Sequence, residues 1–259
     1  MLFSRGFIAS VLLATSVVFA SPTPAGKELA KRGAVLTAQY ATETEPGGRF
    51  ELENNLWGEA SASKGGSQST QADSVNGNTI AWHTTYNWAG ANNQVKSYAN
   101  VNLLQGINKQ LSAIQSIPTT WQWTYTSASS NLVADVSYDL WLSNTPGTTG
   151  ATSASSYEIM IWLSDRGGAN PAGSNAGSVS INGQTWTLWK GTVGSWKIFS
   201  FVAPSETTNF NADLKPFFTY LINSQGVPAS SYLVQAQSGT EPFIGTATLT
   251  TTAYSLAIN

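Results

Sequence analysis

Turn-forming pairs divide this 259-residue chain into short alternating segments from about residue 35 onward. Such pairs occur at Pro46-Gly47, Asn76-Gly77, Ala89-Gly90, Pro146-Gly147 and Asn182-Gly183. Glycine, proline and asparagine favour tight turns, and many short strands joined by turns are typical of an all-β sandwich or barrel. Asn182-Gly183 lies between two alternating runs and predicts a two-residue hairpin. No internal repeat or linker divides the chain, so one all-β domain is expected.

One stretch departs from the strand pattern. Between Asn211 and Asn223, apolar residues recur at helical spacing, at Leu214, Phe217, Phe218, Leu221 and Ile222. This spacing predicts one amphipathic helix packed on the outside of the sandwich. Pro216 fits only near a helix start, so we expect Asn211 or Asp213 to cap the helix.

Residues 1–20 have the features of a secretory signal peptide. Arg5 provides the positive start, and an apolar stretch leads to a cleavage site at Val18-Phe19-Ala20. That stretch is too short and too interrupted to span a membrane. The dibasic pair Lys31-Arg32 predicts that residues 21–32 are a propeptide; a disordered arm with two incidental basic residues is the alternative. We therefore expect a secreted, extracellular protein with a single domain over residues 33–259.

Charge and composition argue against several classes of partner. Without residues 1–32, the 12 basic residues fall to 8 and the 14 acidic residues to 13, so the formal net charge changes from −2 to −5. Nucleic acids and anionic membrane surfaces require basic patches, so neither is expected as a partner. The chain has no cysteine and one histidine, His83, which excludes thiolate sites and His-rich metal centres. No phosphate-binding glycine loop or ion-binding acidic motif occurs, so we expect no metal and no cofactor.

Two predicted strands have one apolar face and one unusual face. In residues 132–142, alternate apolar residues point one way, and the opposite face carries Asp135, Ser137, Asp139 and Trp141. In residues 157–163, one face carries Glu158, Met160 and Trp162. Aromatic rings stack on sugars and carboxylates act on them, so this mixture fits a carbohydrate cleft.

Glu158 and Glu241 lie within strand-like segments, where apolar residues are usual. Burying a charge costs several kcal/mol unless the charge is paired or used. Two carboxyl groups cleave glycosidic bonds when they lie about 5–5.5 Å apart in retaining enzymes or about 6.5–9.5 Å apart in inverting ones. We expect Asp139 to hydrogen-bond one glutamate and separate the two pKa values. On residue chemistry alone, a glycosidase and a carbohydrate-binding lectin with stray acids both stay open.

Two segments around these glutamates resemble glycoside hydrolase family 12. They are Tyr157-Glu158-Ile159-Met160-Ile161-Trp162-Leu163 and Gly239-Thr240-Glu241-Pro242-Phe243-Ile244-Gly245. Further segments, among them Asn54-Asn55-Leu56-Trp57-Gly58, follow in family order over nearly all of residues 35–259. The resemblance implies a β-jelly-roll of two antiparallel sheets with a concave substrate cleft, and a retaining double-displacement mechanism.

The same resemblance implies roles for individual residues. Glu158 matches the family nucleophile, Glu241 the acid/base, and Asp139 the aspartate that supports the nucleophile, with Met160 beside it. Asn55 and Trp57 match residues at the non-reducing side of the cleft, where Trp57 would stack on a sugar. Trp141 and Trp162 share faces with the acids and are further candidates for sugar contact.

The expected substrate follows from the resemblance of single segments to one subgroup of the family. Thr79-Ile80-Ala81-Trp82-His83-Thr84 and Thr119-Thr120-Trp121-Gln122-Trp123 look more like the xyloglucan-specific fungal members than the general endoglucanases. Xyloglucan is thus the expected substrate, with mixed-linkage glucan or soluble cellulose as the alternative and a non-catalytic glucan-binding module as a third possibility. Family members often carry a disulfide near the N-terminus, which this chain lacks, so packing must hold its first hairpin. We expect a monomer, and a core or cleft-wall position for His83.

Overall fold

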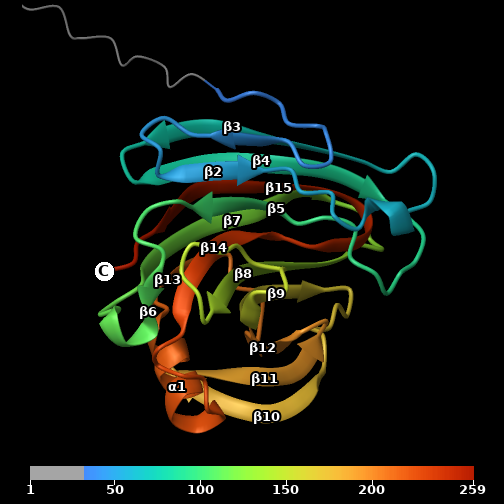
Figure 1. Cartoon of the computed structure of the whole chain (residues 1–259). Coiled ribbons are helices and arrows are strands. Elements are labelled where there is room, and N and C mark those ends of the chain that lie inside the picture. Colours follow the sequence, from blue (N-terminus) through green and yellow to red (C-terminus); the bar gives the residue numbers. More distant parts are fainter. Residues whose placement is uncertain (1–31) are drawn as a thin grey trace, which may run out of the picture.

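The computed structural model describes residues 32–259 as two stacked sheets (Figure 1). The predicted signal peptide, and all of the predicted propeptide except Arg32, lie outside these residues. The larger sheet contains, in spatial order, β1 (Thr42–Thr44), β2 (Phe50–Glu53), β5 (Ala99–Leu103), β14 (Tyr232–Thr240), β8 (Val133–Ser143), β9 (Ser155–Arg166), β12 (Trp196–Val202), β11 (Gln184–Val193) and β10 (Ser174–Ile181). The short β6 (Lys109–Gln110) pairs with β14.

The smaller sheet contains β13 (Asn209–Asp213), β7 (Pro118–Ala128), β15 (Pro242–Leu256), β4 (Thr79–Trp88) and β3 (Ser67–Asn76), in that order. Strand β15 joins the two sheets, because its first residues pair with β8 and the rest of it pairs with β4 and β7. Two 3₁₀ turns, Glu59–Ser61 and Leu111–Ala113, complete the regular structure outside the one helix.

Strand pairing is antiparallel with one exception. Strands β9 and β12 run parallel, with Glu158 opposite Ile198. The chain leaves β9, forms the β10–β11 hairpin and returns through β12 to the edge of β9, and this route places the two strands in the same direction. The predicted turn at Asn182-Gly183 is confirmed: Ile181 pairs with Gln184, and both turn residues have positive φ, 54° and 75°.

The alternation predicted for the central strands is confirmed in the core. The apolar faces of β8 and β9 are buried between the sheets together with rings from the smaller sheet, including Val136, Tyr138, Leu140, Ile159, Ile161, Trp82, Trp121 and Tyr254. The first hairpin is held by packing in place of a disulfide, since Phe50 and Leu52 are fully buried. Burial of two such side chains contributes about 1.5–3 kcal/mol each.

The helix begins later than the sequence pattern predicts. Helix α1 spans Lys215–Gln225 and lies beside β10 and β11, with Phe217, Phe218 and Leu221 buried (Figure 1). Asn211 is not its cap, because residues 209–213 pair with β7 as strand β13. Leu214 occupies the N-cap position, and the Asp213 carboxylate accepts the Lys215 and Ile117 backbone N–H groups from just outside the helix. The helix ends at Gly226, whose φ of 73° gives a left-handed C-cap.

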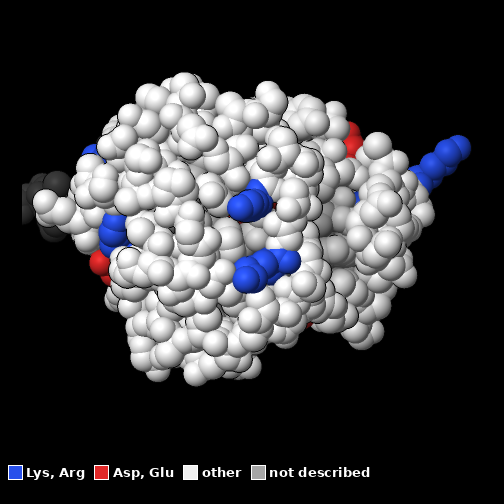
Figure 2. Space-filling model, turned by 60° about the horizontal axis from the view of Figure 1, so that its bottom comes forward, with Lys and Arg blue, Asp and Glu red and all other residues white. Residues whose placement is uncertain are grey.

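Charged side chains are sparse on the surface. Figure 2 shows one face of the described residues on which the few Lys and Arg side chains stand among uncharged neighbours. No helix within residues 32–259 has the length and apolar character needed to cross a membrane.

Candidate active site

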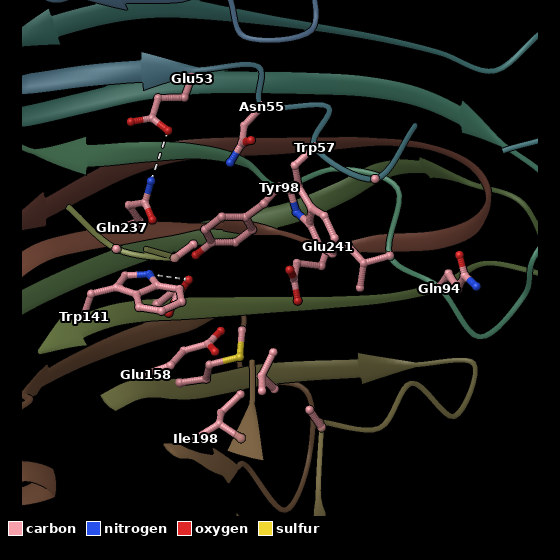
Figure 3. A pocket seen from close by; sticks show the side chains of 18 of the residues that line it. Glu53, Asn55, Trp57, Gln94, Tyr98, Trp141, Glu158, Ile198, Gln237 and Glu241 are labelled. Carbon is pink, nitrogen blue, oxygen red and sulfur yellow. Dashed lines mark hydrogen bonds between the residues drawn. The ribbon is translucent and has the colours of Figure 1, made fainter. Parts of the chain in front are cut away.

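A cleft of about 1300 Å³ crosses the free face of the larger sheet. It extends from Tyr40 and Thr42 at the β1 end to Trp196 and Ile198 on β12. All eight site residues predicted from the sequence line it: Asn55, Trp57, Asp139, Trp141, Glu158, Met160, Trp162 and Glu241. Figure 3 shows Glu241 beside Trp57 and Glu158 beside Ile198, with Glu53 and Asn55 on the opposite side of the cleft from Ile198.

Strand register brings these side chains together. On the cleft face, Glu158 of β9 lies opposite Trp141 of β8, and Met160 lies opposite Asp139. On the other side of β8, Asp139 lies opposite Gln237 of β14. Residues that alternate on neighbouring strands share a face, so a few side chains per strand suffice to line the cleft floor.

Glu158 is held by an indole from the neighbouring strand. The Trp196 Nε1–H donates a 2.7 Å hydrogen bond to Oε2 of Glu158. Trp196 in turn packs edge to face against Trp141, with ring centroids 5.2 Å apart. Burial raises the pKa of Glu158, and the Trp196 hydrogen bond opposes part of this rise because it stabilises the charged form.

Glu241 does not lie inside a strand, contrary to the prediction. It is the single residue between the end of β14 and the start of β15, where the chain leaves the larger sheet. Asp135 fixes the backbone of this junction: Asp135 Oδ1 accepts the Glu241 N–H at 3.2 Å, and the Asp135 N–H donates to the Glu241 carbonyl at 3.2 Å. Burial, and then the nearby carboxyl groups of Asp135, Asp139 and Glu158, raise the pKa of Glu241 well above its usual range.

Asp139 does not hydrogen-bond either glutamate, which corrects the expectation from the sequence. Its Oδ2 accepts the Trp141 Nε1–H at 2.9 Å (Figure 3). Its Oδ1 is buried and has no hydrogen-bond partner within the described residues. Burial and the charge of Glu158 raise the pKa of Asp139 well above its usual range.

These environments distribute protons unequally over the cleft. Burial, and then the charge of nearby carboxyl groups that include Glu158, raise the pKa values of both Asp139 and Glu241, so ionisation of Glu158 favours the protonated forms of the other two. Glu158 has the Trp196 donor to stabilise its charge. One ionised and one protonated carboxyl group in a single cleft is the combination that acid-assisted glycoside cleavage requires.

The remaining predicted residues differ in backbone conformation and in how far they are exposed to the cleft. Asn55 has a left-handed backbone (φ 46°), which asparagine tolerates. Trp57 is 50% exposed and offers a free ring face at the rim. Met160 and Trp162 are almost completely buried, and the Trp162 Nε1–H points to the Met160 sulfur at 3.4 Å.

The backbone at Gly150 packs directly against the Trp141 ring. A Cβ atom added to Gly150 would lie 2.3 Å from the Trp141 ring, so only glycine fits there. The Gly150 N–H also donates a 2.6 Å hydrogen bond to Gln235 of β14. The loop that carries Gly150 therefore fixes the tryptophan over the cleft floor.

Several cleft residues have no counterpart in the sequence prediction. Trp196 follows the Gly194-Ser195 turn, and alternation along β12 places it on the same face as Ile198. This alternation could have identified Trp196 as a cleft residue from the sequence. Asp135 shares its predicted face with Asp139, but its contact with Glu241 depends on the crossing of β15 between the sheets. Tyr98 and Gln237 lie in the cleft through long-range pairing that the sequence does not show.

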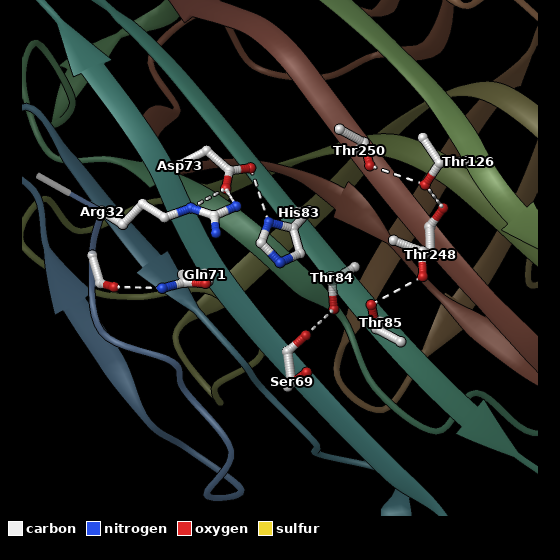
Figure 4. Close-up of polar contacts among 11 residues, drawn as sticks. Arg32, Ser69, Gln71, Asp73, His83, Thr84, Thr85, Thr126, Thr248 and Thr250 are labelled. Atoms are coloured by element: carbon white, nitrogen blue, oxygen red, sulfur yellow. Dashed lines mark hydrogen bonds and ion pairs between the residues drawn. The ribbon is translucent and has the colours of Figure 1, made fainter. Parts of the chain in front are cut away.

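His83 lies away from the cleft, on strand β4 of the smaller sheet. Its Nδ1 is 2.8 Å from Asp73 Oδ2, and Arg32 donates to the other oxygen of Asp73 at 2.6 Å (Figure 4). The expectation of a core or cleft-wall histidine is therefore wrong: its side chain is about one quarter exposed and belongs to a surface ion-pair cluster.

Comparisons with known proteins agree with this geometry. A 49% identical relative from Aspergillus niger, a probable xyloglucan-specific endo-beta-1,4-glucanase A, matches over 83% of this chain and 88% of its own length. A 47% identical relative from Phytophthora nicotianae, described as an inactive glycoside hydrolase, matches over 82% of this chain and 87% of its own length.

The fold and the family are also matched. The crystal structure of Trichoderma harzianum endoglucanase 3, from family GH12, superposes with a TM-score of 0.81 at 41% identity and covers 88% of this chain and 98% of that one. The expected β-jelly-roll is confirmed by this match. The family model described as glycosyl hydrolase family 12 matches residues 48–259. The chain is thus a member of glycosyl hydrolase family 12.

Proposed function

We propose that the protein is a retaining endo-β-1,4-glucanase that hydrolyses xyloglucan. The observation that carries this proposal is a pair of cleft carboxyl groups in different surroundings: Glu158 accepts the Trp196 indole N–H, and the Glu241 backbone N–H donates to Asp135. A cleft that crosses the larger sheet from β1 to β12 accommodates sugar units on both sides of this pair, which supports cleavage at internal bonds.

The proposed reaction has two displacements. In the first, the Glu158 carboxylate attacks the anomeric carbon, the glycosidic bond breaks, and Glu241 transfers its proton to the leaving oxygen. In the second, the ionised Glu241 accepts a proton from water, the resulting hydroxide attacks the same carbon, and the bond to Glu158 breaks. Inversion occurs twice, so the anomeric configuration is retained.

Asp139 is proposed to position the nucleophile. The Trp141 hydrogen bond orients its carboxyl group through Oδ2. Its raised pKa favours the protonated form, so Oδ1, which has no partner within residues 32–259, would be able to donate a hydrogen bond to Glu158 when the side chain turns toward it. This donor would stabilise the carboxylate as it leaves the sugar in the second displacement.

Xyloglucan specificity is supported by relatives and is open to a direct test. The Aspergillus niger relative carries a xyloglucan-specific name, whereas the Trichoderma harzianum protein is an endoglucanase. We expect the initial rate on xyloglucan to exceed those on mixed-linkage β-glucan and carboxymethylcellulose by at least about tenfold. Equal or higher rates on the latter two would move the substrate to the unbranched glucans.

The relative described as inactive makes a glucan-binding module the second candidate. Glu158→Gln separates the two functions, because it removes the nucleophile and keeps the side-chain shape. An enzyme loses turnover in this variant but still binds glucan, whereas a binding module shows no hydrolysis even with Glu158 in place.

Secretion, processing after Arg32 and a monomeric state complete the proposal. In the structure, Arg32 pairs with Asp73 on the smaller sheet, and loss of Arg32 would leave Asp73 bound to His83. N-terminal sequencing of the secreted protein should give Gly33 as its first residue. Sedimentation should give a single species near the mass of residues 33–259.

A further inference from the structure

Glu53 is a cleft acid for which the proposed mechanism has no use. It is the last residue of β2 and lines the cleft. Four strand spacings separate β2 from β9 through β5, β14 and β8. At about 4.8 Å each, these put the Glu53 backbone roughly 19 Å along the sheet from the strand of Glu158, while its carboxyl group reaches over β5 to Gln237 of β14, two spacings from β9.

Two amides hold the Glu53 carboxylate in place. Its Oε2 accepts the Gln237 Nε2–H at 3.0 Å and the Asn100 Nδ2–H at 3.3 Å (Figure 3). Asn100 is itself anchored, because its amide also donates to the Tyr98 carbonyl at 2.8 Å. Both of these bonds end on Oε2, and the Asn102 amide also lowers the pKa of the Glu53 carboxyl group against the larger effect of burial; no hydrogen bond within residues 32–259 ends on Oε1, which can accept one from a ligand in the cleft.

No cation compensates this carboxylate within residues 32–259. Burial raises the pKa of Glu53 to about 7, and the neighbouring amides only partly oppose this rise. A buried acid without a cation destabilises a fold, so a purely structural role gives Glu53 little benefit. A role in binding the hydroxyl groups of a ligand explains why a carboxyl group lies at this position.

The surroundings fit a sugar unit. Thr42, Asn55 and the half-exposed ring of Trp57 line the same end of the cleft. Sugar sites combine a ring that stacks on the apolar face of a pyranose with polar groups that bind its hydroxyl groups.

We propose that Glu53 is a specificity-determining residue that accepts hydrogen bonds from hydroxyl groups of a glucan unit bound at the β1–β2 end of the cleft, away from the cleaved bond. This inference rests on the proposed function and deepens it. Glu53 would strengthen the binding of chains long enough to reach β2 and leave short oligosaccharides unaffected.

Two substitutions and one matched control test the proposal. In Glu53→Gln, the remaining carbonyl oxygen can still face Asn100 and Gln237, so the change falls on the atom that faces the cleft. Glu53→Ala removes both atoms. Glu51→Gln makes the same charge change two residues earlier on β2, at a position that does not line the cleft; because the Glu51 charge adds to burial in raising the pKa of Glu53, its removal does not weaken Glu53 as an acceptor.

Binding is measured by calorimetry in the Glu158→Gln background, so hydrolysis does not interfere. The ligands are xyloglucan oligosaccharides of increasing backbone length. We expect Glu53→Ala to weaken binding of the long ligands about tenfold and Glu53→Gln to weaken it severalfold, with short ligands and the Glu51→Gln control unchanged. In the hydrolytically active protein, the KM for long substrates should rise while kcat stays constant.

The outcomes are distinguishable. Unchanged affinity for long ligands would overturn the proposal, and so would an equal loss for short and long ligands, which indicates a structural role. If the Glu158→Gln protein with Glu53 intact binds no glucan, the proposed function itself fails, and the inference fails with it.

Discussion

The two sheets share one core but present free faces of different chemistry. On the smaller sheet, threonine hydroxyl groups pair across exposed strands, Thr85 with Thr248 at 3.0 Å and Thr126 with Thr250 at 3.2 Å (Figure 4). On the larger sheet, the corresponding face carries carboxyl groups that are buried among aromatic rings and have raised pKa values.

This difference between the two faces shows that the destabilising groups are gathered on the larger sheet. Exposed hydroxyl groups hydrogen-bond to each other and to water, and each pair contributes little to the stability of the fold. Buried carboxyl groups are unfavourable as charges and persist where chemistry needs them. Substitutions on the two faces should therefore have opposite profiles: large effects on activity from the larger sheet, and small effects of any kind from the smaller one.

The largest effect is expected from Glu158→Gln. Loss of the proposed nucleophile should lower kcat on xyloglucan by a factor on the order of a thousand or more, because the amide that replaces the carboxylate cannot form the covalent intermediate. Initial rates measure this effect, and Thr250→Val on the smaller sheet is the matched control. A kcat of the Glu158→Gln protein within tenfold of the unsubstituted protein would contradict the contrast between the faces.

The next effect concerns pH and stability. The raised pKa of Glu241 means that the native state holds this proton more tightly than the unfolded chain. Its stabilising effect is therefore complete below the unfolded pKa, about 4.3, and is lost as pH rises through the higher native pKa. Glu241→Gln should thus raise the free energy of unfolding at pH 8 relative to the unsubstituted protein, and change it little at pH 4. Thermal unfolding at both pH values tests the sign, which would be reversed if Glu241 were stabilised as a charge.

A smaller effect is expected from Trp196→Phe. This change removes the donor to Glu158 and keeps a ring against Trp141. A hydrogen bond to a charged group contributes about 1.5 kcal/mol, so kcat/KM should fall roughly tenfold. Loss of the donor raises the pKa of Glu158, so the acid limb of the pH–rate profile should move to higher pH. An unmoved acid limb would show that Glu158 does not control it.

The smallest effect is expected from Asp73→Asn. Asp73 contacts His83 on the smaller sheet, and also Arg32 where the chain is not cleaved; exposed contacts of this kind contribute at most about 1 kcal/mol. Stability should fall by no more than that, and kcat on xyloglucan should stay the same. A clear loss of activity would link the smaller sheet to the cleft and remove the contrast between the faces.

Local patterns in the sequence were sufficient for much of the fold. Alternation along β8 and β9 identified both the core face and the cleft face, and Asn182-Gly183 identified its hairpin. The start of α1 was misplaced because residues 209–213 pair with β7, and this pairing overrides the local preference of Asn211 for a helix cap. The parallel pairing of β9 with β12 also depends on the global route of the chain.

The candidate site was predicted in its residues but not in its contacts. Glu158 and Glu241 were found as acids in apolar surroundings, and Trp57 and Trp141 as aromatic neighbours. The partners that set their protonation were not found, since Trp196 and Asp135 reach the glutamates only through strand pairing and the crossing of β15. Glu53 was missed because nothing near it in the sequence distinguishes it from an ordinary exposed acid.

The position of Glu241 between β14 and β15 makes catalysis sensitive to the relative placement of the two sheets. Glu158 belongs to the larger sheet alone, whereas Glu241 is fixed at the point where the chain passes into the smaller one. Any sliding of one sheet over the other would move the proposed proton donor relative to the proposed nucleophile before either sheet lost its own hydrogen bonds. On heating, turnover should therefore decline at a lower temperature than that at which the β-structure is lost. Enzyme activity would then report the relative position of the two sheets.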